Sequence, residues 1–549
     1  MAKALMIQGT GSGAGKSVIV AGLCRIFRDM GIKVAPFKAQ NMALNSFITK
    51  EGGEIGRAQA FQAEAAGIEP CNDINPVLLK ASSNSGCQVI LNGEVYANMR
   101  ADEYYGIKEK AWESVTAAYD RLAAGYDLIV IEGAGSPAEI NLREAEIVNM
   151  SIARYANAPV ILVGDIDKGG VFASFYGTVE LLKDMTFAKG QNTPLTPLDR
   201  GELSDADFIK AFIVNKFRGD IEILRPGLEM IEGKTGKPVI GVLDYQGDLG
   251  LHEEDAIPVE RIIPRYINNH LKPLKIIVLG LRYISNFTDF DPFMYEADVE
   301  IKYSLDEADI RSADLIIIPG SKNTVSDLLL LREHGIEDSV KSAVNKGGLL
   351  AGICGGYQML GQKILDPYGV ESGSNEIDGM GLLDIETTYD KTKTTCQVEA
   401  ELVQGQESGV RSNGIFRFLT HNSELLTLNS LRGYEIHMGH STGAIGLFKL
   451  KRFFLNSQLL TLNSELLLDG SVKGNVWGTY IHGIFDNDDF RTALLNSIRK
   501  KKGLPLKETG FNYHEKKDEA IDRWAGILKK SVDVSFMLKQ VGMEDCVKK

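Results

Sequence analysis

Disulfide patterns, long apolar runs and an excess of positive charge are all missing from this sequence, and each absence excludes a class of protein. The six cysteines are Cys24, Cys71, Cys87, Cys354, Cys396 and Cys546. Their scatter, without a CxxC pair, argues against a disulfide framework or a zinc site and fits a reducing cytoplasm. No run of about 18 uncharged apolar residues occurs, so we expect no membrane span. The net charge of −13 argues against nucleic-acid binding, because contacts to phosphates require a basic surface.

The length of 549 residues predicts several domains, and a hydrophobic content of 44% is typical of a globular chain. The first residues, Met1–Ile7, read as a strand and lack the layout of a signal peptide. Apolar, β-branched runs alternate with helical segments, which predicts an α/β fold with parallel sheets covered on both faces. We expect a first domain over 1–245, a linker over 246–272, a second α/β domain over 273–495 and a helical extension over 496–549.

The expected strands are bordered by Gly, Pro or Asp, residues that commonly end strands. In the first domain they are Ala4–Gln8, Lys33–Phe37, Leu128–Glu132, Pro159–Gly164, Phe212–Asn215 and Val239–Leu243. In the second they are Leu274–Gly280, Asp314–Pro319, Gly348–Ile353 and Val476–Ile481. Two similar segments, Asn422–Ser430 (NSELLTLNS) and Asn456–Leu466 (NSQLLTLNSEL), are too short and isolated for a solenoid. We interpret the region around 405–468 as a mobile insert, since surface loops accept insertions readily.

A phosphate-binding loop is the first motif with a chemical meaning. Gly9–Ser17 reads GTGSGAGKS and lies between an expected strand and an apolar helix, Val18–Met30. A Gly-rich turn at a helix N-terminus directs backbone N–H groups and the helix dipole toward a phosphate. Lys16 can reach the β- and γ-phosphates and the Ser17 hydroxyl can bind Mg²⁺. We therefore expect ATP to contact Thr10, Gly11, Gly13, Gly15, Lys16 and Ser17, although Thr10 stands where the strict pattern has Gly.

Further polar residues follow the ends of neighbouring strands. Glu132 ends one strand, at the edge of a parallel sheet where a second Mg²⁺ ligand or a group that orders water belongs. Asn215 and Lys216 follow another strand and could read the nucleotide base. Asp165 and Asp167 close a third strand, where they could bind metal or substrate or simply form a turn.

A second motif places a cysteine at a sharp strand-to-helix turn. Gly347–Gly361 reads GGLLAGICGGYQMLG, so an apolar strand leads into Cys354 and a helix begins near Tyr357. This is the arrangement of a nucleophile elbow, in which flanking glycines let the backbone bend and a helix N-terminus favours the thiolate. The backbone N–H of Gly355 is placed for an oxyanion hole, and Gly320 could supply a second donor.

A thiolate nucleophile needs a base that can also protonate the leaving ammonia. His482 ends a short apolar strand and is our candidate for this base. His437, within GYEIHMG, and His440 are competing candidates.

Several segments in order resemble the cobyric acid synthase family, a group of glutamine-hydrolysing ligases of cobalamin biosynthesis. The resemblance runs from about residue 3 to about residue 495. It is carried by APFKAQNMALNS (35–46), GEIGRAQAFQAEAA (53–66), NPVLLKASSNSGCQVI (75–90), DIDKGGVFASFYGT (165–178), GSKNT (320–324), the cysteine elbow, GYEIHMG (433–439) and GTYIHGIF (478–485).

This resemblance implies a dethiobiotin-synthetase-like P-loop domain, doubly wound around a parallel sheet, and a class I-like glutamine amidotransferase domain. It implies amidation of carboxylates b, d, e and g of adenosylcobyrinic acid a,c-diamide, a corrinoid, with ATP, Mg²⁺ and glutamine. By the same comparison Cys354 is the nucleophile, His482 its base, and Lys38 a group that stabilises the transferring phosphoryl group. Class I amidotransferases usually have Glu where this chain has Ile484, so another group should orient the imidazole, and Asp486 is the candidate named from the sequence.

Two other functions fit parts of the sequence. The first is cobyrinic acid a,c-diamide synthase, which shares both domains but differs after the second strand. The second is a P-loop switch ATPase carrying an inactive amidotransferase fold; such ATPases commonly have a second lysine where this chain has Gly11. The order of the amidations and the oligomeric state, including a homo-oligomer, stay open at this point.

Overall fold

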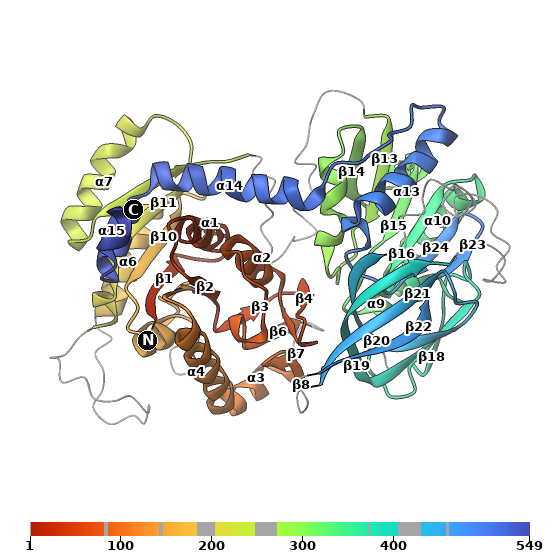
Figure 1. Ribbon diagram of the computed structural model, residues 1–549, viewed down its shortest axis with the longest axis horizontal. Coiled ribbons are helices and arrows are strands. Elements are labelled where there is room, and N and C mark those ends of the chain that lie inside the picture. The colour runs from red at the N-terminus through yellow and green to blue at the C-terminus, as the bar shows by residue number, and fades with distance from the viewer. Residues whose placement is uncertain are drawn as a thin grey trace.

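The computed structural model describes residues 2–81, 86–141, 146–183, 204–247, 272–371, 374–403, 430–456 and 461–548. They form two α/β domains, and helix α14 (Tyr513–Ser531) runs from the second domain along the first (Figure 1). Among these residues no helix is both long and apolar enough to cross a membrane. Most of the expected linker, residues 248–271, lies outside the described residues.

The first domain is built on a six-stranded parallel sheet with the order β12-β11-β10-β1-β9-β2. Its strands are β1 (Lys3–Gly9), β2 (Val34–Phe37), β9 (Leu128–Glu132), β10 (Val160–Asp165), β11 (Ile209–Phe217) and β12 (Val239–Asp244). The six strands expected for this domain are therefore confirmed. They were visible in the sequence because a strand buried on both faces needs a nearly continuous apolar run.

Helices cover both faces of this sheet, as the doubly wound prediction requires. One face is covered by α4 (Lys108–Gly125), α5 (Met150–Tyr155) and α6 (Val171–Lys183). The other is covered by α1 (Lys16–Asp29), α14 and α15 (Val534–Gln540). The indole N–H of Trp524 in α14 donates to the carbonyl of Val18 at 2.6 Å, so the C-terminal helices complete the core of the first domain.

The second domain contains another mostly parallel sheet, with the order β14-β13-β15-β16-β24-β23. Its strands are β13 (Leu274–Leu279), β14 (Val299–Ser304), β15 (Leu315–Ile318), β16 (Leu349–Ile353), β23 (Ser471–Lys473) and β24 (Val476–Thr479). The surrounding helices are η6 (Phe287–Tyr295), α8 (Glu307–Ser312), α9 (Thr324–Glu333), α10 (Ile336–Asn345), α11 (Gly355–Leu360) and α13 (Asp488–Lys501). The four strands expected here are confirmed.

A further sheet lies where the sequence suggested a mobile insert. It has the order β18-β17-β19-β21-β22, and β20 also pairs with β19. Its strands are β17 (Lys363–Leu365), β18 (Glu376–Asp378), β19 (Ile385–Leu402), β20 (Leu431–Gly443), β21 (Phe448–Asn456) and β22 (Thr461–Asp469). Residues 404–429 and 457–460 lie outside the described residues. For the residues described, the expectation of a mobile excursion is wrong, because strands β20 to β22 are paired parts of this sheet.

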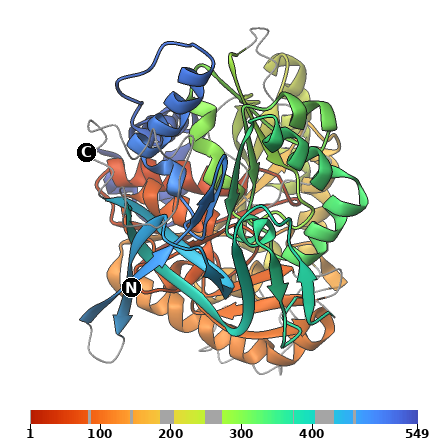
Figure 2. The same cartoon turned by 90° about the vertical axis from the view of Figure 1, so that its right-hand side faces the viewer.

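The first domain also contains smaller elements outside its parallel sheet. They are β3 (Gln40–Met42), β4 (Ser46–Ile48), β5 (Glu54–Gly56), α2 (Arg57–Ala66), β6 (Val77–Ala81), β7 (Gly86–Leu91), β8 (Glu94–Arg100) and α3 (Ala101–Tyr104). Strand β4 contacts both β19 and β20, and Figure 2 shows the second domain in front of these elements. At this contact the buried carboxylate of Glu54 forms ion pairs with Lys80 of its own domain and Lys393 of the other. The two domains therefore meet through buried polar groups.

Candidate functional site

The phosphate-binding loop connects β1 to α1 at the carboxyl edge of the first sheet. Gly13 and Gly15 have φ angles of 73° and 95°, in the left-handed region that favours glycine. A Cβ atom on Gly15 would lie 2.2 Å from the side-chain nitrogen of Asn215, so the close approach of Asn215 also requires glycine there. The ammonium of Lys16 curls back over the loop and donates to the carbonyl of Gly11 at 3.1 Å. The loop has the form that the motif predicts.

Glu132, at the end of β9, is the centre of a buried polar cluster beside this loop. Its carboxylate accepts hydrogen bonds from the Ser17 hydroxyl at 2.7 Å, from Lys38 at 2.9 Å and from Gln62 at 2.6 Å. Gln59 of α2 donates to it at 3.2 Å. Burial disfavours the charged carboxylate, but Lys38 and the hydrogen bonds outweigh burial and lower the pKa of Glu132. The structure thus brings Ser17, Lys38 and Glu132 together, as the sequence predicted.

Other predicted residues brace the loop from neighbouring strands. The amide of Asn215 donates to the carbonyl of Ala14 at 2.9 Å, and Lys216 donates to that of Gly13 at 2.8 Å. Lys216 also lies 3.3 Å from the carboxylate of Asp165. Asn215 therefore lies against the nucleotide loop, while contact with the base stays a prediction.

Cys354 lies at the turn between β16 and α11 and has a strained backbone. Its φ of 52° and ψ of −109° are rarely adopted by residues other than glycine, and such strain is found preferentially at functional sites. A Cβ atom on Gly356 would lie 2.0 Å from the carbonyl oxygen of Ile318, so only glycine fits after this elbow. The Cys354 side chain is 7% exposed, and its thiol lies 3.4 Å from the carbonyl of Ile436 in β20.

The sequence pairs His482 with Cys354, and the thiol acts on the imidazole electrostatically, as one of the groups that raise its pKa. On its other side, Nδ1 lies 2.6 Å from the carboxylate of Asp289 in η6, which also accepts the backbone N–H of Gly483 at 3.1 Å. Burial opposes the charged imidazolium, but Asp289 and Cys354 outweigh it and raise the pKa of His482 to about 10. These three side chains have the contacts of a nucleophile, a base and an orienting acid.

Asp486, the acid named from the sequence, does not fill the third position. Asp289 makes the contact with His482 although it lies far away in the chain, and burial raises the pKa of Asp486 to about 7. The competing histidines are also placed elsewhere. His437 stacks on Tyr480 with ring centroids 3.9 Å apart and contacts Glu435 and the Gly439 carbonyl, while His440 is exposed.

The expected oxyanion donors lie close to this centre. A Cβ atom on Gly355 would lie 2.9 Å from the backbone nitrogen of Ser321, and one on Gly320 would lie 3.2 Å from Cε1 of His482. The turn that contains Gly320 and Ser321 therefore faces both Gly355 and His482. Tyr434 of β20, which the sequence did not single out, stacks on His482 with ring centroids 5.3 Å apart.

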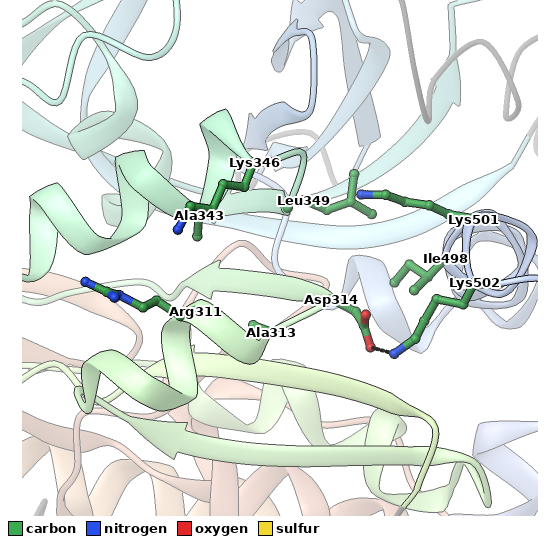
Figure 3. Close-up of a pocket in the computed structure, with 10 residues that line it drawn as sticks. Arg311, Ala313, Asp314, Ala343, Lys346, Leu349, Ile498, Lys501 and Lys502 are labelled. Carbon is green, nitrogen blue, oxygen red and sulfur yellow. Dashed lines mark hydrogen bonds and ion pairs between the residues drawn. The ribbon is translucent and has the colours of Figure 1, made fainter.

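A surface pocket in the second domain lies at the other end of its parallel sheet. Its lining includes Arg311, Lys346, Lys501 and Lys502, and Asp314 pairs with Lys502 at 2.7 Å (Figure 3). Asp314 precedes β15 at its amino end, whereas Cys354 follows the carboxyl end of β16. This pocket is consequently separate from the thiol centre.

A phosphate-binding loop with its acid in one domain, and a Cys–His–Asp centre in the other, define a glutamine-dependent amide ligase. Two family models agree with this division: a CobQ/CobB/MinD/ParA nucleotide binding domain matches residues 5–259, and a CobB/CobQ-like glutamine amidotransferase domain matches residues 275–490.

Similar proteins extend over the whole length of the chain. A cobyric acid synthase of Thermodesulfovibrio yellowstonii is 47% identical, covering 99% of this chain and 100% of its own. One of Caldanaerobacter subterraneus is 46% identical over 97% of both chains, and one of Clostridium botulinum is 44% identical over 99% of this chain and 100% of its own. The chain belongs to the cobyric acid synthase family.

Proposed function

We propose that this protein amidates carboxylates b, d, e and g of adenosylcobyrinic acid a,c-diamide to give adenosylcobyric acid, using ATP and glutamine. The observation that carries this proposal is that one chain contains two clusters of side chains suited to the two half-reactions. One contains Ser17, Lys38 and Glu132, and the other contains Cys354, His482 and Asp289. Full-length similarity to cobyric acid synthases supports the choice of substrate.

In the proposed glutaminase step, the Cys354 thiolate attacks the side-chain carbonyl carbon of glutamine. The tetrahedral oxyanion is stabilised by the backbone N–H of Gly355 and by the turn at Gly320, and His482 protonates the departing nitrogen as ammonia. Water then hydrolyses the thioester to glutamate. Asp289 fixes the ring orientation of His482 and stabilises its positive charge, a function that a short contact at Nδ1 supports.

In the proposed ligase step, an oxygen of the corrinoid carboxylate attacks the γ-phosphorus of ATP, and ADP leaves. Ammonia then attacks the acyl phosphate and inorganic phosphate leaves. Activation is necessary because a carboxylate is a poor electrophile. Lys16 and Lys38 neutralise charge on the transferring phosphoryl group. The oxygens of Ser17 and Glu132, 2.7 Å apart, suit Mg²⁺, which when bound would neutralise phosphate charge.

The number of amides formed distinguishes this proposal from the related diamide synthase. Purified protein is incubated with the a,c-diamide, glutamine and ATP·Mg²⁺, and the corrinoid is followed by mass spectrometry. Four successive replacements of OH by NH₂ are expected. If the a,c-diamide is left unchanged, or if only its precursor without the a- and c-amides is amidated, the chain acts on another substrate.

A glutaminase assay separates the enzyme from a switch ATPase with an inactive second domain. Glutamate release is expected from the native protein and not from Cys354→Ala.

We also assign the protein to the cytoplasm, since all six cysteines are free thiols in the structure.

A further inference from the structure

Two consecutive residues of the first domain reach into the surroundings of His482. The side-chain oxygen of Asn45 accepts the backbone N–H of Phe287 at 3.1 Å, and the backbone N–H of Ser46 donates to the side-chain oxygen of Asn286 at 3.0 Å. Asn45 and Asn286 are each 1% exposed. These two hydrogen bonds form a reciprocal clasp between the domains, and its burial makes loss of either bond costly.

The second-domain side of the clasp leads directly to the acid that orients His482. Asn286 has a φ of 53° and caps the turn of η6, where its carbonyl accepts the backbone N–H of Asp289 at 3.0 Å. The preceding residue, Ser285, donates its backbone N–H to the carbonyl of Gly320 at 2.9 Å. The clasp therefore fixes the segment that carries Asp289. The same segment contacts the turn at Gly320 that we propose for the oxyanion hole.

A third contact holds the other side of His482. The carbonyl of Ser46 accepts the hydroxyl of Tyr434 at 3.2 Å, and the Tyr434 ring stacks on the imidazole. The backbones of Tyr434 and His482 also exchange hydrogen bonds of 2.8 and 3.1 Å. His482 thus lies between η6 and Tyr434, and Ser46 of the first domain forms hydrogen bonds on both sides.

The same stretch of the first domain begins at the ATP site. Lys38 contacts Glu132, and Asn41 donates at 2.9 Å to Gln59, whose own amide donates to Glu132. We call residues 38–48 the strap. Its amino end is fixed to the acid beside the phosphate loop, and its carboxyl end is the clasp.

We propose that Asn45, Asn286 and Tyr434 are positioning residues of the glutaminase centre, so that His482 and Asp289 are aligned for catalysis only while the strap of the first domain is docked. This inference rests on the proposed glutaminase function of Cys354. It assigns to the first domain a part in the chemistry of the second.

The test uses the full-length protein and three substitutions, two that release the clasp and one that removes the third contact. Asn286→Gly keeps the left-handed backbone but loses the contact to Ser46, and Tyr434→Phe keeps the ring on His482 but loses the interdomain hydrogen bond. Asn45→Ala removes the contact to Phe287. The matched control is Thr395→Val, which removes another interdomain hydrogen bond, 2.9 Å long, to the carbonyl of Gly52. Thermal unfolding checks that each variant is folded.

Each of the three variants is expected to lower kcat for glutamine hydrolysis about tenfold with KM for glutamine nearly unchanged, because small misplacements of a catalytic group are costly. Amidation with added ammonia is expected to keep its wild-type rate, since it bypasses His482. The double variant Asn45→Ala, Asn286→Gly should lose less than the two single losses combined, because both release one clasp.

The outcomes separate the inference from the function on which it rests. If these three variants hydrolyse glutamine as fast as the native protein, or if Thr395→Val loses as much as they do, the positioning assignment is wrong. If the native protein and Cys354→Ala release glutamate equally, the proposed glutaminase function itself is wrong.

Discussion

Replacement of Asp289 by Asn tests the least expected member of the thiol centre. The amide has the shape of the carboxylate but no charge, and it would face Nδ1 of His482 at the present distance of 2.6 Å. Two unit charges about 4 Å apart interact by about 4 kcal/mol at an effective dielectric constant of about 20. Loss of that interaction is equivalent to about three pKa units, so the pKa of His482 should fall from about 10 toward its ordinary value.

The expected kinetic effect follows from the same contact. Without the carboxylate, the imidazole is free to adopt the wrong tautomer, which in comparable centres costs on the order of 10²- to 10⁴-fold in kcat. Because Asp289 raises the pKa of His482, its removal should move the alkaline limb of the glutaminase pH profile to lower pH. Glutamate release is measured from about pH 6 to 10.5, a range that spans the ordinary and the raised pKa of a histidine.

The matched control is Asp486→Asn, which changes the acid that the sequence alone named. Its glutaminase kcat is expected to stay within about twofold of the native value, as for a residue outside the reacting groups. Equal losses in the two variants, or an unchanged pH profile in Asp289→Asn, would refute the assignment of Asp289 as the orienting acid.

Three further changes test separate parts of the account. Cys354→Ala should abolish glutamine-dependent amidation while amidation with added ammonia continues, and loss of both would show that the thiol serves another purpose. Glu132→Gln should lower ATP-dependent amidation by on the order of 100-fold or more while glutamine hydrolysis persists, and an unchanged amidation rate would exclude Glu132 from the ATP site. Arg491 is fully buried and contacts Glu296 and Asp488. Its replacement by Met should lower the free energy of unfolding by about 3–5 kcal/mol. The exposed ion pair of Arg225 with Glu222 should contribute much less to stability because solvent screens it, so equal effects of Arg491→Met and Arg225→Met in denaturant titrations would contradict the burial argument.

The parts of the fold that could be predicted are those encoded over short stretches. The strands of both parallel sheets appear as apolar runs, and the two reactive turns carry their own glycines beside Lys16 and Cys354. Glu132 could be found because it ends a strand of the same sheet as the phosphate loop. In each case the local sequence contains the physical reason for the structure.

The parts that could not be predicted depend on contacts between distant segments. Asp289 reaches His482 only because η6 and the end of β24 meet in three dimensions, whereas Asp486 is near in sequence but interacts with Arg57. Strands β20 to β22 mix polar and apolar residues without a clear periodicity, so their pairing in one sheet could not be predicted. The clasp between Asn45 and Asn286 likewise joins two domains and has no signature in either segment.

The central claim is that nitrogen released at Cys354 becomes the amide made at the ATP site of the same protein. The most direct measurement supplies glutamine labelled at its side-chain nitrogen, together with unlabelled ammonium, ATP·Mg²⁺ and the a,c-diamide, and determines the label in each new amide by mass spectrometry. The account predicts that all four amides are labelled with the native protein, and that Cys354→Ala incorporates only unlabelled nitrogen. New amides without label from the native protein would contradict it.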